Sequence, residues 1–170
     1  MGPAGPIYKA WGLAWMFAFL AIHLLNQSVA VTQFRPTLIG VVLALFLGAA
    51  TIFTAHHMRT PRGVSSPLNT RIGLAWGAAF TLASLAVATQ NPSGEQIAFI
   101  FAYTVAILYL AFGAVFFDNL QMGMGLWLGA VNTLALALGP RGYSLVMALA
   151  GGGGLLVAGF LADRRQAPKQ

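Results

Sequence analysis

The chain has 170 residues, of which 58% are hydrophobic and only 7% are charged. A soluble domain carries roughly 25% charged residues, so this composition cannot cover a water-exposed surface and indicates an integral membrane protein. The absence of cysteine excludes disulfides and thiolate metal sites. Although the net charge is +6, the basic residues fall in short loops and near the C-terminal end, which favours an orientation signal over binding to nucleic acid.

Six apolar segments are long enough to cross the roughly 30 Å of bilayer hydrocarbon, which takes about 20 helical residues. In chain order they cover residues 10–32, 37–57, 72–90, 96–117, 121–139 and 143–162. Because backbone groups in lipid must bond internally, each segment is expected to be a helix. We interpret the first as a retained span, since it is longer than the apolar region of a signal peptide. Short connections then predict an all-α fold in which residues 1–170 form a single six-helix membrane domain.

The basic residues are distributed unequally between the two sides of this arrangement. One side holds Lys9, Arg59, Arg62, Arg71, Arg164, Arg165 and Lys169, and the other holds Arg35 and Arg141. The positive-inside rule therefore predicts that both termini are cytoplasmic. We expect a protein of the bacterial inner (plasma) membrane.

A short motif recurs at the starts of alternate spans. The sequence GLAW begins at Gly12 and again at Gly73, and the related GLW begins at Gly125. One interpretation is a two-helix hairpin repeated three times in one orientation, with an axis along the membrane normal and a path at its centre. The other is coincidence, because glycine, leucine, alanine and tryptophan are all common in membrane spans.

The first span carries three polar residues on one helical face, His23, Asn26 and Gln27, at spacings of three and four. A histidine within a span is a functional candidate by default, and its charge can change near neutral pH. This face could bind or gate a polar solute. The alternative is a structural role, in which these side chains form hydrogen bonds between helices.

The last two spans hold further candidates. Asn132 is assigned to the same solute-binding or gating set, although a structural hydrogen bond explains a buried amide at least as well. Gly125 and Gly129 have the small-xxx-small spacing of close helix packing. The run Gly151, Gly152, Gly153 and Gly154 is either a helix break whose carbonyls line a site or a packing surface, and we favour packing.

The second span ends in a basic cluster that we expect to contact lipid headgroups, formed by His56, His57, Arg59 and Arg62. Adjacent histidines point about 100° apart on a helix, so they make a poor metal pair, and we expect no metal and no cofactor. Neither carboxylate pairs nor nucleophile motifs support catalysis, so we assign no catalytic residue and an enzyme is the less favoured interpretation.

Two family resemblances follow from these motifs. The three hairpins, with Trp or Gly at helix starts and Pro36, Pro92 and Pro140 in the outer loops, resemble the HdeD-type stress membrane proteins. The stretches Asn26–Pro36, 101–104 and 125–127 are similar in part to the urea/amide channel family (UreI and AmiS), which implies a ring of protomers. That family places its termini outside, against the charge count here, and no residue role is carried over from either family.

We therefore expect a channel or carrier for a small neutral or weakly polar solute. The alternative is a non-transporting membrane partner or stress-response protein that packs against another membrane protein. The expected partners are the lipid bilayer, a second copy of the chain or another membrane protein, and no nucleic acid.

Overall fold

The computed structural model describes residues 5–28, 35–58, 67–90 and 93–166. In this part of the chain the helices, in order, are α1 (Gly5–Gln27), α2 (Arg35–Met58), α3 (Pro67–Gln90), α4 (Gly94–Phe116), α5 (Asn119–Ala137), α6 (Gly139–Val146), the π-helical segment η2 (Met147–Gly152) and α7 (Gly153–Gln166). The last three run on from one another, and residues 142–165 of them form one apolar span. The described residues thus contain six helices that are long and apolar enough to cross a membrane, which confirms the all-α six-helix expectation.

The first helix differs most from its predicted position. It begins at Gly5 and ends at Gln27, whereas residues 10–32 were expected. Pro6 is tolerated because the amides of the first helical turn have no intrahelical partner to lose. At the other end Ser28 no longer belongs to the helix. Residues 29–32 of the expected span lie outside the described residues.

Side-chain caps set the boundaries of two helices. Ser93 and Gln96 form a capping box at the start of α4, in which each side chain bonds the backbone N–H of the other. Asp118 caps α5 by accepting hydrogen bonds from the backbone N–H groups of Leu120 and Gln121. Between α4 and α5, Phe117 adopts a left-handed backbone with φ 54°, which turns the chain within two residues.

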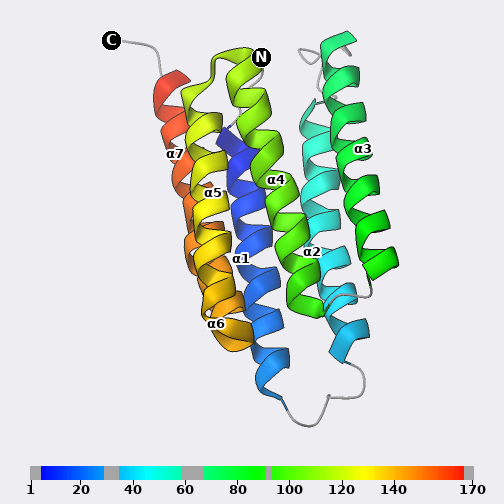
Figure 1. Ribbon diagram of the computed structural model, residues 1–170. Coiled ribbons are helices and arrows are strands. Elements are labelled where there is room, and N and C mark those ends of the chain that lie inside the picture. The colour runs from blue at the N-terminus through cyan, green and yellow to red at the C-terminus, as the bar shows by residue number, and fades with distance from the viewer. Residues whose placement is uncertain (1–4, 29–34, 59–66, 91–92, 167–170) are drawn as a thin grey trace.

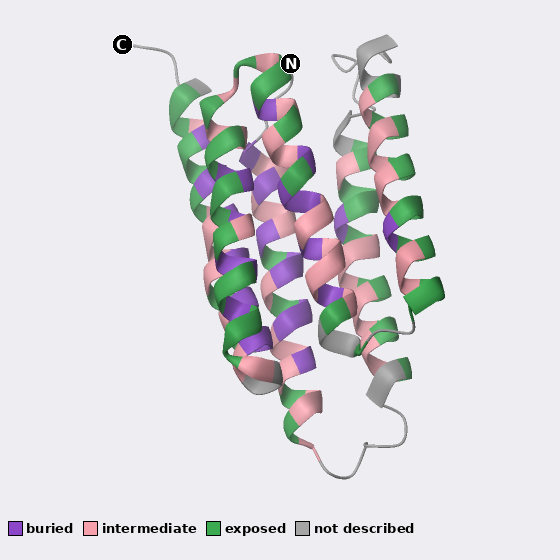
Figure 2. Cartoon of the chain, in the orientation of Figure 1, coloured by how far each residue is buried: buried purple, intermediate pink, exposed green. Residues whose placement is uncertain are grey.

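The six spans are not packed equally (Figure 1). Helix α1 lies in the middle and packs against α2, α6, η2 and α7, while α4 packs against α5. The other two, α2 and α3, stand to one side, where α3 packs mainly against α4. Within their spanning windows only 6% of the residues of α2 and of α3 are buried, against 28% to 44% in the other four. Figure 2 shows this contrast as buried residues concentrated on α1, α4, α5 and α7.

The equivalent positions of the proposed repeat have different surroundings. Trp15 is buried beside Phe19, Trp76 packs against aromatic side chains of α4, and Trp127 is 48% exposed. A central helix also replaces the central path that a threefold arrangement implies. The chain therefore consists of three consecutive hairpins without threefold packing.

Glycines let α1 approach the last span closely. A Cβ added at Gly12 would lie 2.8 Å from the backbone nitrogen of Leu156 and 2.9 Å from the carbonyl oxygen of Gly152. Gly159 is placed in the same way against Gly5, 2.9 Å from its carbonyl oxygen. Between apolar helices in lipid, such close van der Waals contact is a main source of association. The first and last spans thus approach closely at two positions along α1, around Gly12 and around Gly5.

Candidate functional site

The polar residues of the first span meet the last span at the end of the bundle remote from the two termini. His23 Nδ1 lies 3.3 Å from Ser144 Oγ, and His23 Nε2 lies 2.7 Å from Gln27 Nε2. Since the Gln27 amide nitrogen can only donate, we assign a neutral ring in which Nδ1 carries the proton and donates to Ser144. From Gly5 to His23 the helix rises about 27 Å, so the pair lies close to the membrane boundary on the side opposite to the N-terminal end of α1.

A second polar group lies deeper and joins three helices. Asn132 is fully buried on α5. Its Nδ2 donates to the carbonyl oxygen of Phe99 on α4 at 3.0 Å, and its Oδ1 accepts from the Tyr143 hydroxyl at 2.7 Å. The amide is therefore satisfied on both sides, which offsets the cost of burying it in an apolar interior.

Helix α6 connects the two groups, because Tyr143 and Ser144 are neighbours in the chain and both are buried. We call His23, Gln27, Asn132, Tyr143 and Ser144 the outer polar cluster. The arrangement ties α1, α4, α5 and α6 together at one end of the bundle. Such networks contribute roughly 0.6 kcal/mol per hydrogen bond on average in a membrane, so this one favours a defined packing more than it adds stability.

Aromatic side chains lie next to this cluster on its inner side. The Phe19 ring meets the Tyr143 ring edge to face, with centroids 6.1 Å apart, and the Trp15 ring is 5.5 Å from that of Phe19. All three side chains are buried. Along α1, buried apolar and aromatic residues thus continue inward from the cluster.

The predicted solute-binding residues are therefore only partly brought together. His23 and Gln27 contact each other, and Asn132 joins them through the Tyr143–Ser144 pair. Asn26 is half-buried in the last turn of α1. The sequence interpretation missed Tyr143 and Ser144, whose position at the start of a span is also typical of residues that face the membrane interface.

The glycine run is not a break, because the helix continues through it as a π turn followed by α7. A Cβ at Gly152 would lie 2.8 Å from the backbone nitrogen of Met16, and one at Gly151 would lie 3.0 Å from Trp15 Nε1. Gly154 leaves room for the Trp127 ring, whereas a Cβ at Gly153 would have no neighbour within 4 Å. Each of three glycines thus accommodates a different neighbour.

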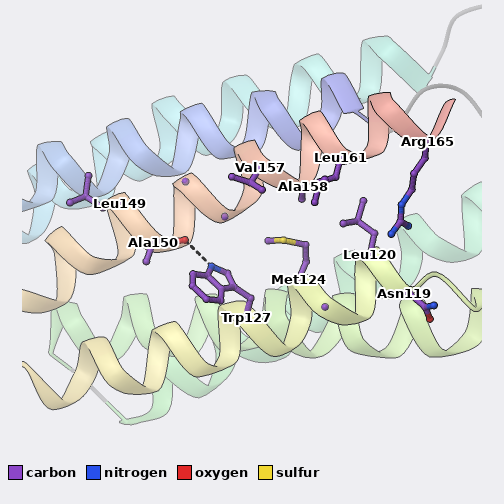
Figure 3. A pocket seen from close by; sticks show the side chains of 13 residues that line it. Asn119, Leu120, Met124, Trp127, Leu149, Ala150, Val157, Ala158, Leu161 and Arg165 are labelled. Atoms are coloured by element: carbon purple, nitrogen blue, oxygen red, sulfur yellow. Dashed lines mark hydrogen bonds between the residues drawn. The ribbon is translucent and has the colours of Figure 1, made fainter. Parts of the chain in front are cut away.

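The wide π turn also offers a backbone acceptor to a neighbouring helix. Trp127 Nε1 donates to the carbonyl oxygen of Ala150 at 2.9 Å, which joins α5 to η2 (Figure 3). Of the other predicted packing glycines, Gly125 lies against the α4 backbone, where an added Cβ would lie 2.7 Å from the carbonyl oxygen of Ala106. A Cβ at Gly129 would make only an ordinary contact, 4.0 Å from the Ala106 Cβ.

The charged side chains that the structure describes lie at the opposite end, where both described chain ends lie. Lys9 forms an ion pair with Asp163, which joins α1 to α7, and Arg165 Nη1 lies 4.0 Å from Asp118 Oδ1. His56 is exposed at the same end.

Two of the predicted headgroup contacts, Arg59 and Arg62, lie outside the described residues, as does the side chain of His57. Within the described residues, no three metal-ligating side chains are close enough to hold an ion.

No protein-family model, curated protein or solved structure matches this chain. The arguments about function therefore depend on the residues and their geometry alone.

Proposed function

We propose that this is a bacterial inner-membrane protein, with both termini in the cytoplasm, that packs against another membrane protein through helices α2 and α3. In this proposal it does not conduct a solute through its own bundle. The observation that carries the proposal is the small buried fraction of α2 and α3, of which only 6% of the spanning residues are buried. The resemblance to the HdeD-type stress membrane proteins fits this function.

One face of α3 is already used inside the chain. Trp76 meets Tyr109 edge to face, with ring centroids 6.0 Å apart, and Phe80 stacks on Phe101 at 5.8 Å. These aromatic pairs attach α3 to α4. The attachment leaves the rest of the α3 surface open.

The open surface of α3 has the composition of a helix-packing surface. Gly73, Gly77 and Thr81 follow one another at intervals of four, and all three are exposed. A Cβ at Gly73 or Gly77 would have no neighbour within 4 Å. Glycines at this spacing let helix backbones approach in membranes. On α2, a Cβ at Gly40 or Gly48 would likewise have no neighbour within 4 Å, so both helices offer surfaces that suit docking.

Cysteine crosslinking in native membranes tests this proposal, because the chain has no cysteine of its own. We expect Thr81→Cys to yield one discrete adduct, whose partner is identified by mass spectrometry. The matched control is Leu126→Cys, which is equally lipid-facing on α5. Adding Gly77→Leu should suppress the Thr81→Cys adduct by blocking close approach. The same adducts from both cysteines, or no adduct at Thr81→Cys, would contradict the docking proposal.

A second candidate is a channel or carrier for a small neutral or weakly polar solute, and the outer polar cluster is the observation that favours it. Half-exposed His23 and exposed Gln27 would meet a solute from outside. The partial similarity to urea/amide channels fits this candidate. Its weakness is the buried aromatic packing of Trp15 and Phe19 below the cluster.

Solute uptake into liposomes separates the two functions. The docking proposal predicts uptake of urea, acetamide and glycerol equal to that of protein-free vesicles. Uptake that exceeds this level and is lost in His23→Ala would establish the second candidate in its place.

Labelling of single cysteines on intact cells tests the proposed orientation. Ser28→Cys should react with a membrane-impermeant thiol reagent, and His56→Cys should react only after the membrane is opened. The reverse pattern would overturn the assignment of the cytoplasmic side.

A further inference from the structure

An open groove of about 610 Å³ lies between α5 and the η2–α7 rod, on the side of the bundle away from α2 and α3 (Figure 3). Its walls are apolar along most of their length, with Leu120, Met124 and Trp127 on one side and Val157 and Leu161 on the other. The groove is distinct from the outer polar cluster and from the exposed surfaces of α2 and α3. It is independent of the function proposed above.

A hydrogen bond joins the two walls near the η2 end of the groove, and glycines widen the rest. The hydrogen bond from Trp127 to the Ala150 carbonyl brings the two walls together. Gly123 and Gly153 line the walls, and a Cβ on either would have no neighbour within 4 Å. These glycines leave room for a chain-shaped ligand.

The length of the groove corresponds to one leaflet of a bilayer. From Asn119 to Trp127 its α5 wall rises about 12 Å, and from Ala150 to Arg165 the other wall rises about 22 Å. One leaflet contributes about half of the roughly 30 Å hydrocarbon core. An acyl chain that enters at the Arg165 end would therefore end near Trp127.

The mouth of the groove at the Arg165 end is cationic. Arg165 points from α7 across the mouth toward α5, and its side chain is 59% exposed. Its acidic neighbour, Asp118, is 4.0 Å away and already accepts two backbone hydrogen bonds from α5. Asp163 is engaged by Lys9, and exposed Arg164 adds a second positive charge next to Arg165. The guanidinium thus has donors left for an anion, in a setting where a headgroup cation would be repelled.

We propose that this groove binds one phospholipid with an anionic headgroup, with an acyl chain along the apolar walls and the phosphate on Arg165. Basic pockets between spans on the cytoplasmic side are suited to anionic headgroups, and each nearby Arg adds about fivefold to the preference. Assignment to the cytoplasmic leaflet rests on the orientation proposed above. The binding itself does not depend on it.

Photocrosslinking in nanodiscs tests the proposal. The discs contain phosphatidylcholine and a trace of a lipid with a diazirine at the end of its acyl chain, as either phosphatidylglycerol or phosphatidylcholine. We expect the phosphatidylglycerol probe to label peptides that contain Trp127 and Val157 about fivefold more than the phosphatidylcholine probe. Both probes should label the exposed surface of α2 equally, which serves as the internal reference.

Two pairs of variants separate a headgroup site from general lipid contact. Arg165→Gln should bring the labelling ratio of the two probes in the groove close to one. Arg164 does not line the groove, so Arg164→Gln should keep most of the preference for the phosphatidylglycerol probe. Gly153→Leu should lower groove labelling by filling the space, and Gly40→Leu, equally open but on α2, should not. Gly123→Leu blocks the same groove from the opposite wall if Gly153→Leu does not fold.

Equal labelling of the groove by both probes would overturn the proposal. So would a headgroup preference that survives Arg165→Gln, or groove labelling that survives both leucine substitutions.

Discussion

Replacing Gly152 by alanine adds one methyl group at a backbone contact between α1 and the last span. The new Cβ would lie 2.8 Å from the Met16 nitrogen, 2.9 Å from the Gly12 carbonyl oxygen and 2.9 Å from Met16 Cβ. Two of these three atoms belong to the backbone of α1, so no side-chain rotation relieves the overlap. The helices must therefore separate locally, and much of their glycine-mediated contact is lost.

The neighbouring Gly153 provides a control that isolates this effect. Both residues lie within the same continuous helical rod, but a Cβ at Gly153 would have no neighbour within 4 Å. Glycine to alanine favours a helix by about 1 kcal/mol in water, and this gain is shared by both substitutions. Overpacking costs about 1–3 kcal/mol. We therefore expect Gly152→Ala to be less stable than Gly153→Ala by about 1–3 kcal/mol.

The two free energies of unfolding can be measured in mixed detergent micelles. Sodium dodecyl sulfate is titrated in to unfold each variant, and the loss of helix is followed by circular dichroism. A lower midpoint for Gly152→Ala with an unchanged slope would support the reasoning. Equal free energies for the two variants would refute it, because the contact between α1 and η2 would then not constrain the packing.

Three further variants test other contacts in the same assay. Asn132→Ala should cost about 1–3 kcal/mol because the Tyr143 hydroxyl loses its buried acceptor. A double-mutant cycle with Tyr143→Phe should give a coupling energy of about 0.6–1.7 kcal/mol, and a coupling of zero would contradict the hydrogen bond. Lys9→Met should cost about 1 kcal/mol or less of stability, since the ion pair with Asp163 is partly exposed. If the pair contributes, the double substitution Lys9→Asp with Asp163→Lys should recover most of that stability. Trp127→Phe keeps the ring but loses the donor to the η2 carbonyl, so we expect a loss of about 0.5–1.5 kcal/mol; an unchanged midpoint would show that this bond adds nothing.

The spans could be predicted from the sequence because hydrocarbon thickness and backbone hydrogen bonding leave few solutions. The described helices lie within a few residues of their expected positions, with the largest shift in α1. That shift arose because the apolar run continues past Gln27, so hydropathy alone did not mark the end of the helix. A proline in the first turn likewise did not mark its beginning, since it is compatible with a helix start.

The packing of these helices could not be predicted in the same way. In a soluble helix the polar face marks the outside, but in lipid both faces are apolar, so the central position of α1 has no hydropathy signal. The glycines at 12 and 152 are separated by about 140 residues, and nothing in the local sequence pairs them. The site was predicted in part: His23, Gln27 and Asn132 were recognised as polar residues within spans, while their link through Tyr143 and Ser144 requires the three-dimensional arrangement.

The contact between α1 and α7 has a consequence for the order in which the chain is made. Synthesis at about 5–20 residues per second separates Gly12 from Gly152 by roughly 7–28 s. During this interval the first helix is already inserted, while the glycines that fit it and the Asp163 partner of Lys9 have not yet been translated. During this interval α1 can pack against α2 but not against the last span, so assembly around the central helix is completed only when the last span is made.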